Sequence, residues 1–186
     1  ISPNGDKVLY QRNFNDIMTD QSFSNIWLIN FDGSGNQPIT TGNFKDNSPK
    51  WSNKGDKFIF KSNRNGKQQI FLFDLSNNSI QKLTNFQYSI GSLRWSPDDK
   101  YILFSSFVDD KRKKLIKMPE KPKGAKWNDP PIEISDLNYK YDSSGFRKPG
   151  ETQFFTLPVS GGTPRQISNI PSEKRAGQGE WINSNK

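Results

Sequence analysis

The sequence has 186 residues, a formal net charge of +8, and neither His nor Cys. Without Cys it offers no disulfide, thiol nucleophile or Cys-ligated metal, and without His it cannot complete a Ser-His-Asp triad within itself. Gly, Pro, Asn, Asp and Ser are abundant while Ala occurs only at Ala125 and Ala176, which favours strands and turns over helices.

The first predicted element is a β-hairpin over residues 1–10. Its turn has Pro3 at the first corner, where a fixed φ is favourable, and Gly5 at the position that needs a positive φ. A second pair of predicted strands, rich in apolar residues, covers residues 25–31 and 37–40, with a glycine-rich turn between them. The longest apolar runs of the chain are four residues, far below the roughly 20 needed to span a bilayer.

This order of elements recurs along the chain with a fixed spacing. Trp51 and Trp95, which end the first strand of their units, are 44 residues apart, and Thr40 and Thr84 are separated by the same 44 residues. Two independent landmarks with one offset indicate a true repeat. The copies of the hairpin are residues 1–10, 51–60, 95–104 and the partial copy 181–186, and those of the second pair are residues 25–40, 69–84 and 153–168.

Four strands per unit at a period near 44 residues are typical of β-propeller blades. We therefore expect an all-β fold of four-stranded antiparallel blades, with about three blades plus a remnant. Propellers usually have four to eight blades, so we interpret the chain as an excised part of a larger protein, or one that closes with another chain. The predicted units are residues 1–50, 51–94, 95–180 and the remnant 181–186, with an insertion over 107–150 between the second and third strands of the third unit.

The repeat also predicts specific backbone and core positions. The left-handed position of the hairpin turn is occupied by Gly5, Gly55, Asp99 and Asn185, and Asp and Asn are the residues other than Gly that best tolerate it. The aromatic residues of the strands are expected to form the core between blades. They are Phe58, Phe60, Phe71, Phe73, Phe104, Phe154 and Phe155.

We expect a functional face at the loops between the second and third strands of the blades, because these loops vary in length. They cover residues 12–24, residues 62–67 and the insertion, and variable loops on a rigid scaffold commonly carry binding. For Trp127 two interpretations stay open, packing of the insertion against the blades or contact with substrate. The candidate residues facing substrate or a partner are Lys126, Trp127, Asp129, Tyr141 and Arg147.

Residues 111–126 hold eight cations against the single acid Glu120. We interpret this stretch as a solvated loop, with an acidic partner as the alternative. Nucleic-acid binding is not expected, since aromatic platforms do not alternate with the basic residues. The acidic pair Asp98–Asp99 falls in a predicted turn, which argues against the flanking carboxylates of a polysaccharide-active propeller.

Three segments carry a resemblance to a known family. Residues 95–105, 70–74 and 81–84 resemble repeats of TolB-type propellers, in which Trp-Ser-Pro-Asp-Gly-Lys and Ile-x-Phe-x-Ser are followed by Ile-Tyr-x-x-Asp and then by a closing Leu-Thr. Residues 117–131, 141–146 and 154–168 resemble the N-terminal propeller of prolyl oligopeptidase-family serine peptidases, with acylaminoacyl-peptidase-like and dipeptidyl-peptidase-like members as the nearest groups.

The resemblance implies a non-catalytic propeller that gates and orients peptide substrates for a C-terminal α/β-hydrolase domain of the same polypeptide. This sequence contains no Gly-x-Ser-x-Gly elbow, so it departs from the complete family. No catalytic residue, cofactor or metal is expected in it. The alternative is a TolB-like protein-interaction propeller without catalysis. Family habit implies a periplasmic or secreted location, and a cytoplasmic one stays open.

Overall fold

The computed structural model describes residues 1–109, 119–128, 140–142, 145–146, 150–171 and 177–182. The described residues form strands joined by turns, and none of them lies in a helix that could cross a membrane. The strands are β1 (Lys7–Asp16), β2 (Gln21–Asn30), β3 (Gln37–Pro38), β4 (Asn47–Trp51), β5 (Lys57–Ser62), β6 (Gln69–Asp74), β7 (Ser79–Lys82), β8 (Ile90–Trp95), β9 (Tyr101–Asp109), β10 (Lys140–Tyr141), β11 (Gly145–Phe146), β12 (Gly150–Pro158) and β13 (Arg165–Gln166).

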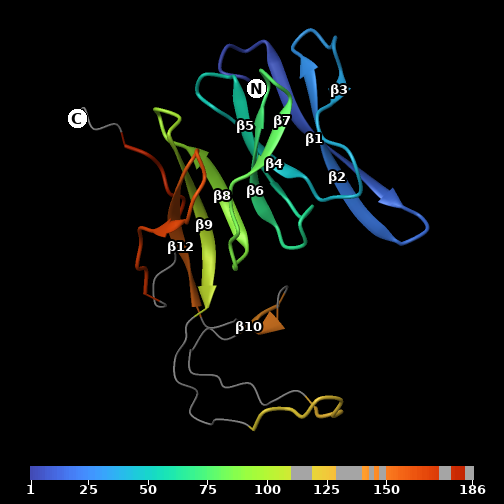
Figure 1. The fold of residues 1–186 in the computed structure, drawn as a ribbon, viewed down its shortest axis with the longest axis vertical. Coiled ribbons are helices and arrows are strands. Elements are labelled where there is room, and N and C mark those ends of the chain that lie inside the picture. The colour runs from blue at the N-terminus through green and yellow to red at the C-terminus, as the bar shows by residue number, and fades with distance from the viewer. Residues whose placement is uncertain (110–118, 129–139, 143–144, 147–149, 172–176, 183–186) are drawn as a thin grey trace.

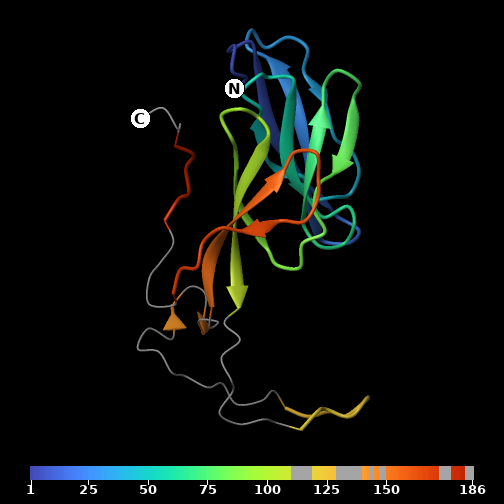
Figure 2. The same cartoon turned by 60° about the vertical axis from the view of Figure 1, so that its left-hand side comes forward.

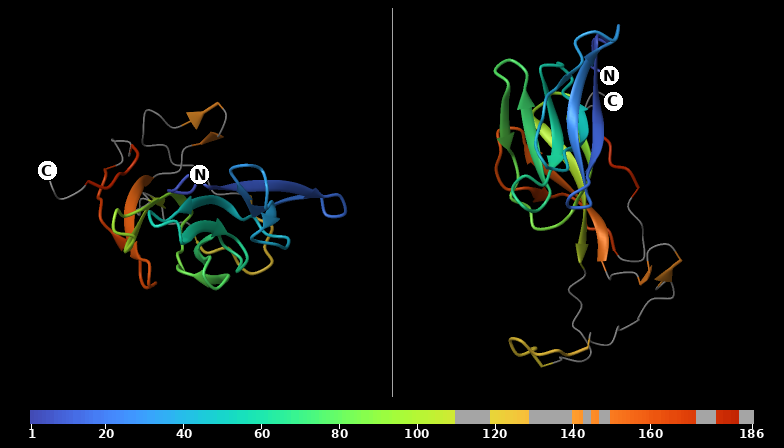
Figure 3. Two further views of the ribbon diagram at one scale, coloured as in Figure 1. Left: turned by 90° about the horizontal axis from the view of Figure 1, so that it is seen from above. Right: turned by 90° about the vertical axis from the view of Figure 1, so that its right-hand side faces the viewer.

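Three antiparallel sheets make up the body of the molecule. The first has the order β1-β2-β3, the second β4-β5-β6-β7, and the third β13-β12-β9-β8. They stand side by side with the second sheet in the middle, as Figures 1 and 2 show, and the view from above in Figure 3 shows them as successive layers. The prediction of an all-β, partial β-propeller is confirmed.

The prediction of a loop over residues 12–24 of the first unit is wrong. Strands β1 and β2 pair without interruption from Lys7 with Asn30 to Asp16 with Gln21, so only residues 17–20 form the connection. The repeat predicted a loop here, but the strands continue, and Phe14 of β1 packs on Phe23 of β2 with ring centroids 5.6 Å apart. Such cross-strand pairs stabilise the extended hairpin, which projects at the lower right of Figure 1.

Two apolar clusters hold the three sheets together. The cluster between the first and second sheets contains Ile26, Phe58, Phe60, Phe71 and Phe73, all at most 4% exposed. The cluster between the second and third sheets includes Phe104 and Phe155, stacked with centroids 5.4 Å apart. The predicted aromatic core is therefore correct except at Phe154. That side chain points to the opposite face of β12 from Phe155 and lies half-buried beside Gly179.

The hairpin turns adopt the predicted backbone. The φ angles are 78° at Gly5, 73° at Gly55 and 57° at Asp99, and Asn185 lies outside the described residues. In the first two turns a buried serine donates to an aspartate four residues later, over 2.8 Å from Ser2 and over 2.9 Å from Ser52. In both turns the serine oxygen also accepts the N–H that begins the next strand, which explains why the copies share this local sequence.

The second and third sheets each contain a buried glutamine that binds the segment following the last strand of the sheet. Gln69 Oε1 accepts hydrogen bonds from the Thr84 hydroxyl and the Phe86 N–H, each 2.7 Å long, while its Nε2 donates to the Phe86 carbonyl over 2.9 Å. The side chain thus satisfies backbone groups of the irregular segment that follows the last strand. The third sheet repeats this arrangement with Gln153, Ser168 and Ile170.

Candidate functional site

The candidate residues of the insertion are not gathered into one site by the described structure. Lys126 and Trp127 lie in the segment 119–128, which is yellow in Figure 2 and stands away from the sheets. Trp127 remains 46% exposed, so its expected packing against the blades is not found. Tyr141 pairs through its backbone with Gly145 in the small β10–β11 ribbon. Asp129 and Arg147 lie outside the described residues, and their predicted roles stay predictions.

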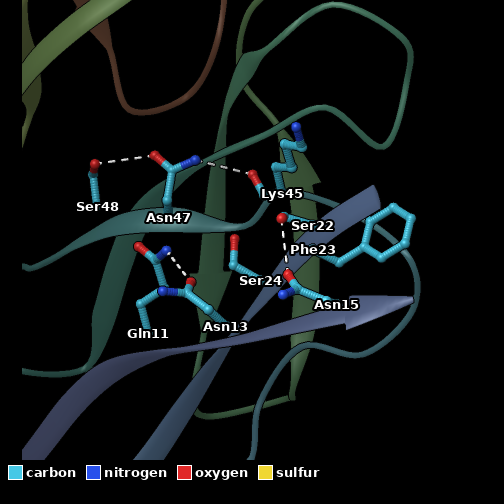
Figure 4. A pocket seen from close by; sticks show the side chains of 9 residues that line it. All are labelled: Gln11, Asn13, Asn15, Ser22, Phe23, Ser24, Lys45, Asn47 and Ser48. Carbon is cyan, nitrogen blue, oxygen red and sulfur yellow. Dashed lines mark hydrogen bonds between the residues drawn. The ribbon is translucent and has the colours of Figure 1, made fainter. Parts of the chain in front are cut away.

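The structure instead forms a polar pocket between the first and second sheets, at the end where the variable loops lie. Its volume is about 660 Å³, and it opens between the β1–β2 hairpin and the beginning of β4 (Figure 4). Two walls face each other across it, one from the hairpin and one from the chain that enters the second sheet. The lining residues are Gln11, Asn13, Asn15, Ser22, Phe23, Ser24, Lys45, Asn47 and Ser48.

The hairpin wall is an extension of a buried strand face. Ile26 and Leu28 occupy this face near the centre of the molecule and pack against the second sheet. Farther along, the same face carries the alternating amides Gln11, Asn13 and Asn15, because side chains two residues apart on a strand point to one side. The face therefore changes from apolar to hydrogen-bonding where the two sheets separate.

The hairpin wall is internally ordered. Gln11 Nε2 donates to Asn13 Oδ1 over 2.6 Å, and the Ser22 hydroxyl donates to Asn15 Oδ1 over 2.8 Å. At the tip, the Thr19 hydroxyl and then the Met18 N–H hydrogen-bond to the carboxylate of Asp16 and lower its pKa from the ordinary 3.8. These bonds hold the end of the hairpin in one conformation.

The opposite wall is formed by an irregular entry into β4. The register between β4 and β5 shifts between Asn47 and Lys50, and Ser48 has a φ of 56°, which is uncommon for a residue other than glycine. Asn47 Nδ2 donates to the Lys45 carbonyl over 3.1 Å, while Asn47 Oδ1 accepts from the Ser48 hydroxyl over 3.0 Å. The bulge thus turns this short polar segment toward the hairpin, as Figure 4 shows.

Ser24 joins the two walls. Its N–H donates to the Phe44 carbonyl over 2.8 Å, its carbonyl accepts the Asp46 N–H over 2.9 Å, and its hydroxyl donates to the Asp46 carbonyl over 2.9 Å. Ser24 is only 5% exposed, so these bonds are shielded from water. The distance between the walls is therefore set by backbone contacts.

A buried ion pair supports the floor beside the pocket. The Asp46 side chain is fully buried, and its Oδ2 lies 2.7 Å from an Arg64 guanidinium nitrogen. Arg64 also lies over the rings of Phe44, Phe60 and Phe71, 5.1–5.4 Å from their centroids. Planar guanidinium groups suit such combined ionic and aromatic contacts. This packing fixes the segment that carries Lys45 and Asn47.

The chemistry of the pocket suits binding. Its lining supplies amide and hydroxyl groups, which both donate and accept hydrogen bonds, together with one cation, Lys45. None of the described residues that line it carries a carboxylate. Among the residues that the structure describes, no three His, Cys, Asp or Glu side chains gather closely enough to hold a metal ion.

The sequence alone does not reveal this pocket, because the repeat predicts a loop over residues 12–24. The available signal was the period-two spacing of Gln11, Asn13 and Asn15, which is typical of a strand with one polar face. The contribution of Lys45, Asn47 and Ser48 had no comparable local signal, because they meet the hairpin only through the packing of two sheets.

Comparison with known proteins agrees with this architecture. The family model described as the TolB beta propeller domain matches residues 1–126. The uncharacterized peptidase YuxL of Bacillus subtilis is 25% identical over 97% of this chain, and the dipeptidyl-peptidase 5 of Porphyromonas gingivalis is 27% identical over 58% of it. These alignments cover 28% and 16% of the two relatives, so the chain spans less than a third of their length.

A solved structure reproduces the fold. The acylaminoacyl peptidase of Pyrococcus horikoshii superposes with a TM-score of 0.65 and 20% sequence identity. The match covers 87% of this chain and 23% of the peptidase. At this level of identity the similarity establishes the arrangement of the blades and leaves the function to be argued from the site.

Proposed function

Because the chain belongs to the TolB beta propeller family, we propose that it is the non-catalytic propeller portion of a serine oligopeptidase. In this proposal the propeller gates and orients peptides for an α/β-hydrolase domain of the same polypeptide. The observation that carries the proposal is the similarity of 97% of the chain to a small part of a longer protein named as a peptidase. The polar pocket, which offers hydrogen bonds at the loop end of the blades, supports a substrate-handling role.

The composition places the chemistry elsewhere in such a protein. A serine hydrolase needs a base to activate its nucleophile, and this base is most often His, which the sequence lacks. The propeller would therefore act through access and orientation. The location that is usual in the resembled family favours a periplasmic or secreted protein, and fractionation of the source cells would test this.

The test is a comparison of the longer polypeptide with a version that lacks residues 1–186. We expect the intact polypeptide to hydrolyse acylated or dipeptidyl chromogenic peptides and to lose this activity with a serine-directed phosphonate. Removal of these blades is expected to open access to the catalytic domain and to change the size limit of the substrates, so that longer peptides are cleaved relatively faster. Absence of phosphonate-sensitive hydrolysis, or an unchanged size limit, would refute the proposal.

The second candidate is a TolB-like interaction propeller in a protein without catalysis. The outer face of the first sheet favours it, since Arg12 lies 4.7 Å from the centroid of the half-buried Trp27, and Phe14 is 37% exposed. If this face closes the propeller with a second chain, sedimentation equilibrium will give a multiple of 21.3 kDa for the isolated chain. This candidate predicts no phosphonate labelling of the longer polypeptide.

A further inference from the structure

The hairpin wall of the pocket carries three side-chain amides in a regular row. Gln11, Asn13 and Asn15 occupy alternate positions of β1 on one face, opposite Ile26, Ser24 and Ser22 of β2. Residues two apart on a strand are separated by about 6.6–6.8 Å, which is also the two-residue repeat of any extended peptide. One amide therefore faces each second residue of a peptide lying parallel to the strand. We call these three residues the amide row.

We propose that the amide row binds the main chain of an extended peptide, with about four to five residues in the pocket. This deepens the proposed function, on which it rests, by assigning where and how the propeller holds its peptide. A side-chain amide contains the same donor and acceptor as a peptide group, so it pairs with a main chain of any sequence.

Each amide of the row retains a group available for this purpose. The Gln11 and Asn13 side chains share one hydrogen bond, and Asn15 Oδ1 is used by Ser22. Within the described part of the chain, Gln11 Oε1, Asn13 Nδ2 and Asn15 Nδ2 have no protein partner. The row thus offers one acceptor and two donors, which fit one peptide N–H and two peptide carbonyls.

The opposite wall defines the direction of the peptide. Among the described residues of the lining, Lys45 alone is charged, and it stands on the wall facing the row, with Asn47 between it and Ser48 in Figure 4. Its ammonium group favours a carboxylate, either the C-terminus of the peptide or an acidic side chain. The bonds of Ser24 and the Asp46–Arg64 pair hold this wall in place before any ligand arrives. A preformed site loses less entropy when it binds.

The lining favours a peptide over an oligosaccharide. Sugar sites commonly present an open aromatic ring, but Phe23, the one ring among the described lining residues, packs against Phe14 at 5.6 Å. In Figure 4 its side chain points away from the row. The pocket volume of about 660 Å³ lies within the range of roughly 300–1,000 Å³ typical of ligand sites.

The test measures binding of a defined peptide to the 186-residue chain. The probe is a fluorescein-labelled, N-acetylated hexapeptide of alternating alanine and serine with a free C-terminus, followed by fluorescence anisotropy. We expect Asn13→Ala and Asn15→Ala each to weaken binding about fivefold, the effect of one net hydrogen bond, and the variant with all three amides replaced to weaken it at least 30-fold. Asn13→Gln should restore part of the affinity.

Asn4→Ala is the matched control, because Asn4 is an exposed asparagine in the turn before β1, outside the lining of the pocket. It should bind as the parent does. A hexapeptide with N-methyl groups at alternate residues, which lacks the N–H groups of one edge, should bind at least fivefold more weakly. In a ¹H–¹⁵N spectrum the side-chain amide signals of Asn13 and Asn15 should shift on addition of the peptide.

The outcomes separate this proposal from the proposed function. Equal binding by the parent and the triple variant would overturn the amide row, while peptide handling elsewhere on the propeller would stand. Binding of maltohexaose or chitohexaose in place of the peptide would overturn it in favour of an oligosaccharide site. No binding of any probe would overturn it as well, whereas hydrolysis by the longer polypeptide decides the proposed function independently.

Discussion

The carboxylate of Asp99 accepts hydrogen bonds from both the backbone N–H and the side-chain amide of Asn53, over 2.8 and 2.7 Å. The two residues belong to corresponding turns of neighbouring sheets. A second oxygen of Asp99 accepts the Lys54 N–H over 3.0 Å, and Asn53 Nδ2 donates to the Ser96 carbonyl over 2.8 Å. A residue at a left-handed turn position therefore also joins the second and third sheets.

Replacement of Asp99 separates these two roles. Asp99→Gly keeps the positive φ of 57° and removes the contacts to Asn53 and Lys54. We expect a loss of about 1–2 kcal/mol in the free energy of unfolding, because the lost charge-assisted bonds outweigh the backbone relief that glycine provides. Urea titration measures this difference. Asp99→Asn, which keeps one acceptor oxygen, should lose less, and a glycine variant as stable as the parent would disprove the bridging role.

Asp98 predicts a pH dependence of stability. A hydrogen bond from the Ser96 hydroxyl, followed by one from the Lys100 N–H, lowers the pKa of Asp98 from its ordinary 3.8. The folded state binds the proton more weakly than the unfolded state does. The stabilisation is therefore complete above about pH 4 and is lost as the pH falls through the folded pKa.

The measurement is the free energy of unfolding of the parent and of Asp98→Asn between pH 2.5 and 6. The stability difference between them should be largest near pH 6 and shrink toward pH 2.5. The control is Asp20→Asn, since Asp20 is also an exposed turn aspartate, although its own φ is 51°. A difference that stays constant with pH would contradict the assignment to Asp98.

The buried Asp46–Arg64 ion pair beside the pocket predicts that removal of the cation alone destabilises the fold more than removal of both charges. Arg64→Ala leaves the Asp46 carboxylate buried without its cation, and we expect a loss of about 3–5 kcal/mol in the free energy of unfolding. The additional change Asp46→Asn removes the uncompensated charge and should recover part of that loss. Thermal and urea unfolding of the three proteins would check this order. If the double variant is no more stable than Arg64→Ala, the loss comes from the aromatic contacts of Arg64 and the charge argument fails.

Gly150 is expected to tolerate no side chain. Its φ is 145°, and a Cβ atom there would meet the Val108 carbonyl and come within 2.9 Å of the Asp109 Cα. Gly150→Ala should reduce stability by about 2–4 kcal/mol through backbone strain and this clash. Gly177→Ala, where the space is open and φ is unexceptional, is the control and should leave the unfolding midpoint unchanged. If the two variants unfold at the same midpoint, the close approach of β9 to Gly150 would be refuted.

The blade repeat could be predicted from the sequence because its causes are local. A turn that requires positive φ admits few residue types, so Gly5, Gly55 and Asp99 revealed it directly. The same local logic failed for the first hairpin. There the repeat predicted a loop over residues 12–24, whereas Phe14 pairs with Phe23, nine residues later, and stabilises a strand on each side.

The sequence by itself determined the blade order, the 44-residue spacing, the turn positions and most of the aromatic core, because backbone preference and hydrophobic alternation act between near neighbours. Only the tertiary structure decided which faces meet. It placed Asn13 across from Asn47, Asp99 beside Asn53, and Arg64 on the buried Asp46. The first two pairs join different sheets, and the third joins segments 18 residues apart at one end of the second sheet. Their distances depend on how strands and sheets pack, which no local pattern encodes.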